Sequence, residues 1–318
     1  MRWLMVGAAV ALVAAGLGFW LSGGDRLVTA WALDGQREAQ GAMAGALRRL
    51  RAGEAAAVAS LMIVCFGYGF FHAVGPGHGK LLIGGYGAAR EVGAVRLSAV
   101  ALASSLAQGL TAVMLVGAGV WLIGWGRERM TQMADQVFAP LSFAAIALVG
   151  LWLVWRGARG LWRLQRIAAH DHDHDHHPHD HDHDHDHGHG HGDDGAVCGS
   201  CGHSHGPSAE AVARAAGPRE VAALIAAVAI RPCTGALFVL ILTAQMGVFW
   251  AGVLGTLAMA LGTASVTILV AVAAVGLRRS ALAGLADSPI LARAQPILEL
   301  AVGALVAVLA THLALAAL

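Results

Sequence analysis

The sequence predicts an all-α polytopic membrane protein with about six to seven transmembrane helices, two of them broken by proline. Of its 318 residues, 57% are hydrophobic and only 13% are charged, a composition typical of proteins with several helices across a bilayer. The hydrophobic residues are gathered in runs long enough to span a membrane, with short charged loops between them. One long polar insert, rich in histidine, separates the runs into two halves and is expected to be a disordered cytoplasmic loop.

The first 54 residues are predicted to form two segments. Residues 1–22 are an apolar stretch that is either a transmembrane segment or a signal peptide, since a small-residue cleavage site follows at residues 28–30. Residues 23–54 are an extracytoplasmic amphipathic segment, with apolar residues at helical spacing beside several arginines. This pattern fits a helix at the membrane surface and equally a helix packed on the protein. The spaced apolar residues are Met43, Leu47 and Leu50.

Residues 55–156 are predicted to form the first half of the transmembrane bundle, and their first apolar run is broken. The break consists of Gly75, Pro76 and Gly77. Glycine loosens the backbone, and proline lacks an N–H donor and clashes with the preceding turn, so a regular helix cannot continue here. Within a membrane, such a break is tolerated only where it is buried in protein or lines a wet cavity.

Two histidines, His72 and His78, lie on either side of this break. Ionisable groups at membrane depth are costly and usually functional, and imidazole suits nickel, cobalt, zinc and copper. A bend would bring the two rings together, which predicts a metal ion pathway. The alternative is a pair of buried histidines that hydrogen-bond to neighbouring helices. Lys80 is expected to extend to the cytoplasmic interface, and Gln108 contributes to a polar stripe on the next span.

The insert, residues 157–219, carries fourteen of the seventeen histidines. Most of them alternate first with aspartate and then with glycine, and near neutral pH much of the imidazole is unprotonated and free to bind a divalent ion. The insert is therefore predicted to bind metal, the alternative being a solvated tract with no role in transport. These histidines are His170, His172, His174, His176, His177, His179, His181, His183, His185, His187, His189, His191, His203 and His205.

A short cysteine motif lies within the same insert. Cys198 and Cys201 form a CxxC beside His203 and His205, a pattern with which thiolate and imidazole groups can share a zinc ion. The evidence for zinc is weak, because a flexible loop lacks the surrounding hydrogen bonds that normally shape such a site. A redox role is disfavoured because no βαβ pattern surrounds the two cysteines.

Residues 220–318 are predicted to form the second half, whose first span is interrupted at residues 231–235. An arginine at this depth needs a partner or water, and Cys233 is either a small core residue or a soft metal ligand. Glu299 lies near the start of the last span and either carries a coupled proton or is solvated. Over both halves, the residues expected along the translocation path are Gly75, Pro76, Gly77, Lys80, Gln108, Arg231, Pro232, Thr234 and Thr263.

The distribution of basic residues predicts the orientation of the chain. With the histidine insert in the cytoplasm, twelve arginines fall on the cytoplasmic side and seven on the outer side, as the positive-inside rule favours. One proline-broken span opens each half of the chain. This arrangement is typical of secondary transporters, in which discontinuous helices meet near the middle of the membrane.

The sequences HAVGPGHGK at residues 72–80 and RPCTG at residues 231–235, with the histidine-rich insert between them, resemble the nickel/cobalt efflux branch of the NicO transporter family. The resemblance covers residues 55–318. It implies an exporter in the bacterial inner membrane that lowers cytoplasmic nickel and cobalt, with the histidines, proline and cysteine of these motifs in its path. The chain departs from relatives at Gly75 and Gly77, where some of them carry an acidic residue.

We therefore expect a transporter rather than an enzyme, exporting Ni²⁺ or Co²⁺, with Zn²⁺ as a further option and no prosthetic group. The lipid bilayer is its other partner, no basic and aromatic patch indicates nucleic acid, and a homo-oligomer is left open. The competing hypotheses are an uptake permease with the same site, a metal-sensing or metal-storing membrane protein, and a thiol–disulfide carrier that uses Cys65 and Cys233.

Overall fold

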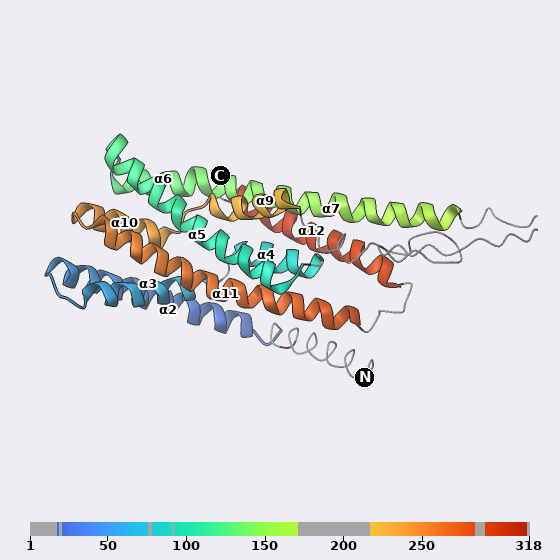
Figure 1. The fold of residues 1–318 in the computed structure, drawn as a ribbon, viewed down its shortest axis with the longest axis horizontal. Coiled ribbons are helices and arrows are strands. Elements are labelled where there is room, and N and C mark those ends of the chain that lie inside the picture. The colour runs from blue at the N-terminus through green and yellow to red at the C-terminus, as the bar shows by residue number, and fades with distance from the viewer. Residues whose placement is uncertain are drawn as a thin grey trace, which may run out of the picture.

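The computed structural model is built of helices, which confirms the all-α prediction for the part of the chain that it describes. The described residues are 18, 21–75, 78–90, 92–170, 217–283 and 290–316. Residues 1–17 and most of the histidine insert lie outside them, and so does the choice between a first span and a signal peptide. Figure 1 shows the helices as one elongated bundle, with most of their axes along its length.

The helices of the first half lead up to the insert. They are α2 (Gly24–Arg51), α3 (Ala57–Val74), α4 (His78–Ala89), α5 (Ala94–Ala118) with a π-helical turn η1 (Gly119–Ile123), α6 (Arg127–Met133), a second π-helical turn η2 (Ala134–Phe138), and α7 (Ala139–His170). The predicted insert begins at residue 157, but α7 continues as a helix to its first histidine, His170. The arginines and tryptophans of this stretch are compatible with a helix that extends beyond the membrane.

The second half contains α9 (Pro218–Ala229), α10 (Thr234–Gln245), α11 (Phe249–Ala283) and α12 (Ile290–Ala316). Among the described residues, five segments are long and apolar enough to cross a membrane, and the bent pair α9–α10 is a sixth candidate. The five are Ala57–Val74, Ala94–Ile123, Glu128–Arg166, Phe249–Arg279 and Gln295–Leu315. With the bent pair counted as one span, the described residues give six, the lower end of the predicted six to seven.

The amphipathic segment of residues 23–54 forms α2, which lies along α3 (Figure 1). Met43 and Leu47, two of its spaced apolar residues, are buried in the core. Nearer the start of α2, the Trp31 ring contacts the Phe71 ring of α3 edge-on, with the two centroids 5.1 Å apart. Of the two interpretations of this segment, the structure supports a helix packed on the protein.

The closest approach between α3 and α11 depends on glycine. A Cβ atom at Gly69 would overlap the backbone carbonyl of Met259, and a Cβ atom at Gly262 would overlap the backbone carbonyl of Phe66. Small residues let transmembrane helices approach closely and gain van der Waals contact in an environment that supplies little hydrophobic driving force. This interface fixes the position of the broken end of α3 against the uninterrupted α11.

Two hydrophobic cores are stacked along the bundle. The first includes Leu61 of α3 and Leu240 of α10, and the second includes Ile83 of α4 and Leu224 of α9. Figure 1 shows α4 and α9 displaced from α3 and α10 toward the end at which α7 projects. The two helix breaks, between α3 and α4 and between α9 and α10, thus lie at the junction of the two cores.

Candidate functional site

The first helix break is formed where the sequence predicts it. Gly75 follows α3 in an extended conformation (φ −57°, ψ 170°), and α4 begins at His78. His72 lies in the last turn of α3 and is partly buried. The side chains of residues 76–81, those of His78 and Lys80 included, are outside the described part of the chain. The structure therefore places His72 at the break. It places the backbone of His78 at the start of α4, and the ring of His78 lies outside the described part.

The second break is also formed as predicted. α9 ends at Ala229, α10 begins at Thr234, and the two helices are bent by 63° at the turn between them. Pro232 is buried in this turn, and Cys233 caps α10 with an extended backbone (φ −70°, ψ 128°). Since proline has no N–H to donate and disfavours a helical conformation in the residue before it, the turn stops α9 and lets α10 start in a new direction.

Tyr68 joins the two breaks. Its ring is stacked on the ring of His72, with centroids 5.9 Å apart and an angle of 9° between the planes. It also lies so close to Gly235, the second residue of α10, that a Cβ atom there would overlap the ring. Its hydroxyl group is hydrogen-bonded to Thr234 and accepts a hydrogen bond from Nε2 of Gln36 at 3.3 Å. The broken end of α3 is therefore in direct contact with the start of α10.

Two sulfur atoms lie beside this contact. Cys233 Sγ is 3.7 Å from Sδ of Met259 on α11. Cys233 is partly buried and Cys65, one turn before Tyr68 on α3, is fully buried, and both are free cysteines. The thiol and the thioether form a soft patch at the start of α10, the helix that Tyr68 contacts.

Three further residues predicted along the path make contacts with backbone or aromatic groups. Gln108 Nε2 donates to the carbonyl oxygen of Arg231 at 2.9 Å. The break leaves this carbonyl without a donor from its own helix, and the glutamine side chain supplies one. The guanidinium group of Arg231 lies over the ring of Phe143, 5.2 Å from its centroid. Thr263 Oγ1 donates to the carbonyl oxygen of Gly69 at 3.2 Å. These contacts hold α5, α7 and α11 against the two breaks.

Comparison with known proteins identifies the family. The model of the NicO family, described as high-affinity nickel-transport protein, matches residues 58–318. The chain belongs to the NicO family. A Haemophilus influenzae protein named "Putative nickel/cobalt efflux system" is 28% identical over 204 residues, which are 64% of this chain and 62% of that relative. The match thus spans less than two thirds of the relative's length. No solved structure matches the chain.

The NicO match confirms the resemblance inferred from the two motifs and the insert. The protein is a multi-pass membrane protein of a nickel and cobalt transporter family, and that family is not one of enzymes. The family description names nickel, and the name of the relative includes nickel and cobalt. Neither names zinc.

Within the described part of this NicO protein, no three histidine, cysteine, aspartate or glutamate side chains lie close enough together to hold a metal ion. His170 is the last residue of α7, and its side chain lies outside the described part. The other thirteen histidines of the insert, with Cys198 and Cys201, are also outside it. Their proposed metal contacts therefore remain predictions.

Sequence reasoning does not single out Tyr68 and Met259 as site residues. Tyr68 lies one helical turn before His72 and so shares a face with it, and it is one of only two tyrosines in the chain. Met259 lies one turn before Thr263 on α11. The spacing of these residues gives a signal on each helix, but their meeting with α10 depends on the tertiary fold.

Proposed function

We propose that this NicO protein exports Ni²⁺ or Co²⁺ from the cytoplasm across the bacterial inner membrane. The observation that carries the proposal is the contact of two broken helices through Tyr68, which gathers chemically active residues of both halves in one place. The family description supports nickel as cargo, and the name of the relative supports nickel or cobalt and the outward direction. Ionisable and sulfur-bearing groups at such a junction are typical of substrate pathways.

His72 and His78 are the proposed imidazole ligands of the passing ion, and Cys233 is the proposed sulfur ligand. Imidazole nitrogen binds nickel and cobalt well, and a nearby thiol makes the site softer than the hydrated ion's oxygen shell. Tyr68 holds the His72 ring by stacking, so its proposed role is to orient the imidazole toward α10. The Met259 thioether lies beside the cysteine on the opposite helix.

Transport requires a site that binds the ion weakly enough to release it. Thr234 is exposed even though it lies at the junction of the two cores, so the start of α10 is not sealed by neighbouring side chains. This exposure favours a transient site over a storage site.

The histidine insert is proposed to collect the ion on the cytoplasmic side. Its position in the cytoplasm follows from the excess of arginines expected on that side of the membrane. α7 leads into the insert and α9 leads out of it toward the second break. An ion that binds in the insert would thus be held next to the helices that end at the junction.

Nickel accumulation in cells tests both the site and the direction. Cells that express the wild type are expected to hold less ⁶³Ni than cells without it, and His78→Ala is expected to abolish the difference. His312→Ala is the matched control, because this histidine is exposed near the end of α12 and belongs to neither helix break. More nickel in wild-type cells would show uptake instead of export.

The same assay separates export from sensing, storage and thiol–disulfide exchange. A sensing or storing protein predicts that deletion of residues 170–205 removes all function while His78→Ala has no effect. A thiol–disulfide carrier predicts that serine at Cys65 or Cys233 abolishes function whether or not metal is present. The proposed exporter predicts loss with His78→Ala and only reduced export with the deletion.

A further inference from the structure

Four charged residues form a closed ring at the insert end of the bundle. They are Arg90, directly after α4, Arg156 of α7, Glu220 of α9 and Glu299 of α12. Arg90 contacts Glu220 (Nη2–Oε2, 3.4 Å) and Glu299 (Nη1–Oε1, 3.4 Å). Arg156 contacts the same two carboxylates, through Nη1 to Oε1 of Glu220 at 3.4 Å and through Nε to Oε2 of Glu299 at 3.3 Å. Each arginine therefore bridges both glutamates.

The ring is buried inside a membrane-spanning bundle. The side chains of Arg90 and Glu299 are only 1% and 5% exposed, and Glu299 belongs to the candidate span Gln295–Leu315. The expectation that Glu299 is solvated is therefore wrong, because α4 and α7 pack over this part of α12. Buried charges are tolerated only when they are paired and hydrogen-bonded, and inside a membrane they usually mark function.

The two glutamates differ in their surroundings. Glu220 is 23% exposed, and besides the two arginines it accepts a hydrogen bond from the Tyr86 hydroxyl at 2.9 Å. Glu299 is nearly inaccessible to water and accepts a hydrogen bond from Nε2 of Gln295 at 3.3 Å, while Arg278 of α11 is near enough to act on it electrostatically. Glu220 is thus the carboxylate whose negative charge is better stabilised by hydrogen bonds and water. The negative charge of Glu299 costs more free energy to bury.

The ring lies between the insert and the two helix breaks. α4 has 12 residues, so the ring end of this helix is about 18 Å from its start at His78. Glu220 is in the first turn of α9, whose other end is the second break. Arg156 precedes the insert and Glu220 follows it, so both of its flanks contribute to the ring. α4 and α9 are therefore short helices with one end at the ring and the other at the proposed metal site.

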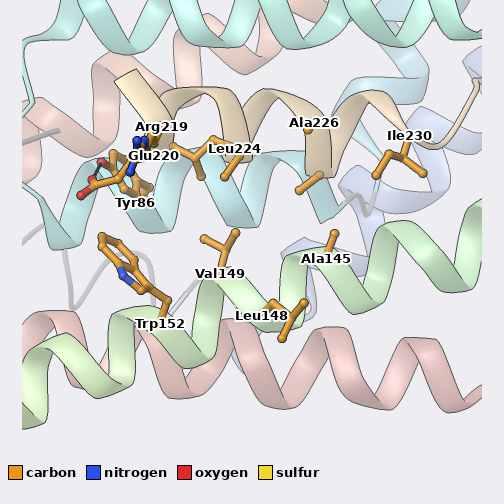
Figure 2. A pocket seen from close by; sticks show the side chains of 12 residues that line it. Tyr86, Ala145, Leu148, Val149, Trp152, Arg219, Glu220, Leu224, Ala226 and Ile230 are labelled. Carbon is orange, nitrogen blue, oxygen red and sulfur yellow. Dashed lines mark hydrogen bonds between the residues drawn. The ribbon is translucent and has the colours of Figure 1, made fainter. Parts of the chain in front are cut away.

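A cavity lies along α9. It has a volume of about 590 Å³ and is lined by apolar side chains of α7 and α9. Figure 2 shows Tyr86 and Glu220 together at one end of the cavity and Ile230, next to the second break, at the other. α9 is consequently packed less densely against α7 along the cavity, and Ser142 Oγ of α7 donates to the carbonyl oxygen of Ala227 at 2.7 Å and joins the two helices there.

We propose that Glu299 is a proton-binding residue that couples opening of the ring to metal movement at the breaks. This inference rests on the proposed transport. With both glutamates ionised, the ring is neutral and its four ion pairs hold α4, α7, α9 and α12 together. When Glu299 takes up a proton from the side on which Arg156 and Glu220 are partly exposed, its two ion pairs are lost and the ring has a net charge of +1. Arg90 and Arg156 then have no ion pair with α12, while Glu220 keeps both arginines. The ring end of α4 is thereby released from α12, and α9 stays paired with α4 and α7.

Purified protein in liposomes tests this coupling. Ni²⁺ entry into liposomes loaded with a metal-sensitive dye is measured with and without an imposed pH gradient. For the wild type, we expect downhill Ni²⁺ flux and a several-fold change in flux when the gradient is imposed. For Glu299→Gln, we expect downhill flux to persist and the response to the gradient to be lost. Glu128→Gln, an exposed carboxylate of α6 outside the ring, is the matched control and should behave like the wild type.

The outcomes distinguish this proposal from the transport on which it rests. A response to the pH gradient that survives in Glu299→Gln overturns the proposal. A folded Glu299→Gln variant that loses Ni²⁺ flux both with and without the gradient also overturns it, because the ring would then have a purely structural role. A wild type that moves Ni²⁺ downhill without any response to pH overturns proton coupling but leaves transport standing. A wild type that moves neither Ni²⁺ nor Co²⁺ refutes both. If Glu299→Gln alone does not fold, Arg90→Gln/Glu299→Gln removes one charge of each sign and is measured in its place.

Discussion

Substitution of Gly69 by alanine tests the helix contact that positions the first break. The added Cβ would lie 2.8 Å from the carbonyl carbon and 3.0 Å from the Cα of Met259, and it would overlap the carbonyl oxygen. Carbon atoms pack best about 3.5–4.0 Å apart, so α3 and α11 must separate by roughly 1 Å. Overpacking of this kind costs about 1–3 kcal/mol, and the weakened Thr263–Gly69 hydrogen bond adds about 0.6 kcal/mol.

Gly67→Ala is the matched control for this change. Gly67 lies in the same helix, two residues earlier, and a Cβ atom there meets nothing within 4 Å. Both variants gain the same preference of alanine for helix over glycine, so the difference between them isolates the helix contact. We expect Gly69→Ala to be less stable than Gly67→Ala by about 2–4 kcal/mol.

Thermal unfolding of the two variants in the same detergent measures this difference. At about 2–4 °C per kcal/mol, the unfolding midpoint of Gly69→Ala should lie about 5–15 °C below that of Gly67→Ala. Nickel export should fall with it, because His72 lies one turn beyond Gly69 on the same helix. Equal midpoints for the two variants would refute the close approach of α3 and α11, and with it the inference that glycine sets the position of the break.

Three further substitutions probe the junction itself. Tyr68→Phe keeps the ring stacked on His72 but loses the hydrogen bond from Gln36, worth about 0.5–1.5 kcal/mol, so the Ni²⁺ concentration for half-maximal flux should rise about 2–10-fold; an unchanged value shows that this hydrogen bond does not help to position the ring. Gln108→Leu leaves the Arg231 carbonyl without its donor and should destabilise the protein by about 1–3 kcal/mol, measured by thermal unfolding against Gln108→Asn. Cys233→Ser should remove the sulfur-to-cobalt charge-transfer absorption of the Co²⁺-loaded protein, whereas a band that persists excludes this thiol as a ligand.

The sequence predicts the two helix breaks and the residues beside them. Proline and glycine change the backbone wherever they occur, so their effect can be inferred without knowing what packs around them. The structure confirms an interruption after Gly75 and another around Pro232, with Cys233 at the start of α10. Hydrophobic runs of sufficient length likewise predict the number of spans, because the thickness of the membrane sets the length of each one.

The contacts across the bundle could not be predicted in this way. Tyr68 and Gly235 are far apart in the chain, and neither the motif at residues 231–235 nor the sequence around Tyr68 indicates that the two residues touch. Arg90 and Glu299 lie at the edges of apolar runs, where charged residues usually face water. Their burial results from the close packing of α7 along α12, where Cβ atoms at Gly150 and Gly157 would clash with the α12 backbone, and from the contact of α4 with α12.

The two breaks also divide the bundle mechanically. α3 and α10 belong to the first hydrophobic core, α4 and α9 belong to the second, and the uninterrupted α11 contributes to both. Rotation about a few backbone bonds at the breaks can therefore move α4 and α9 while α3 and α10 keep their contacts with α11 in the first core, as hinge motions require. Within the described residues, the ring of ion pairs ties the far ends of α4 and α9 to α7 and α12. These ion pairs oppose the motion. A proton on Glu299 removes two of them, at the end of α4 that is farthest from the proposed metal site.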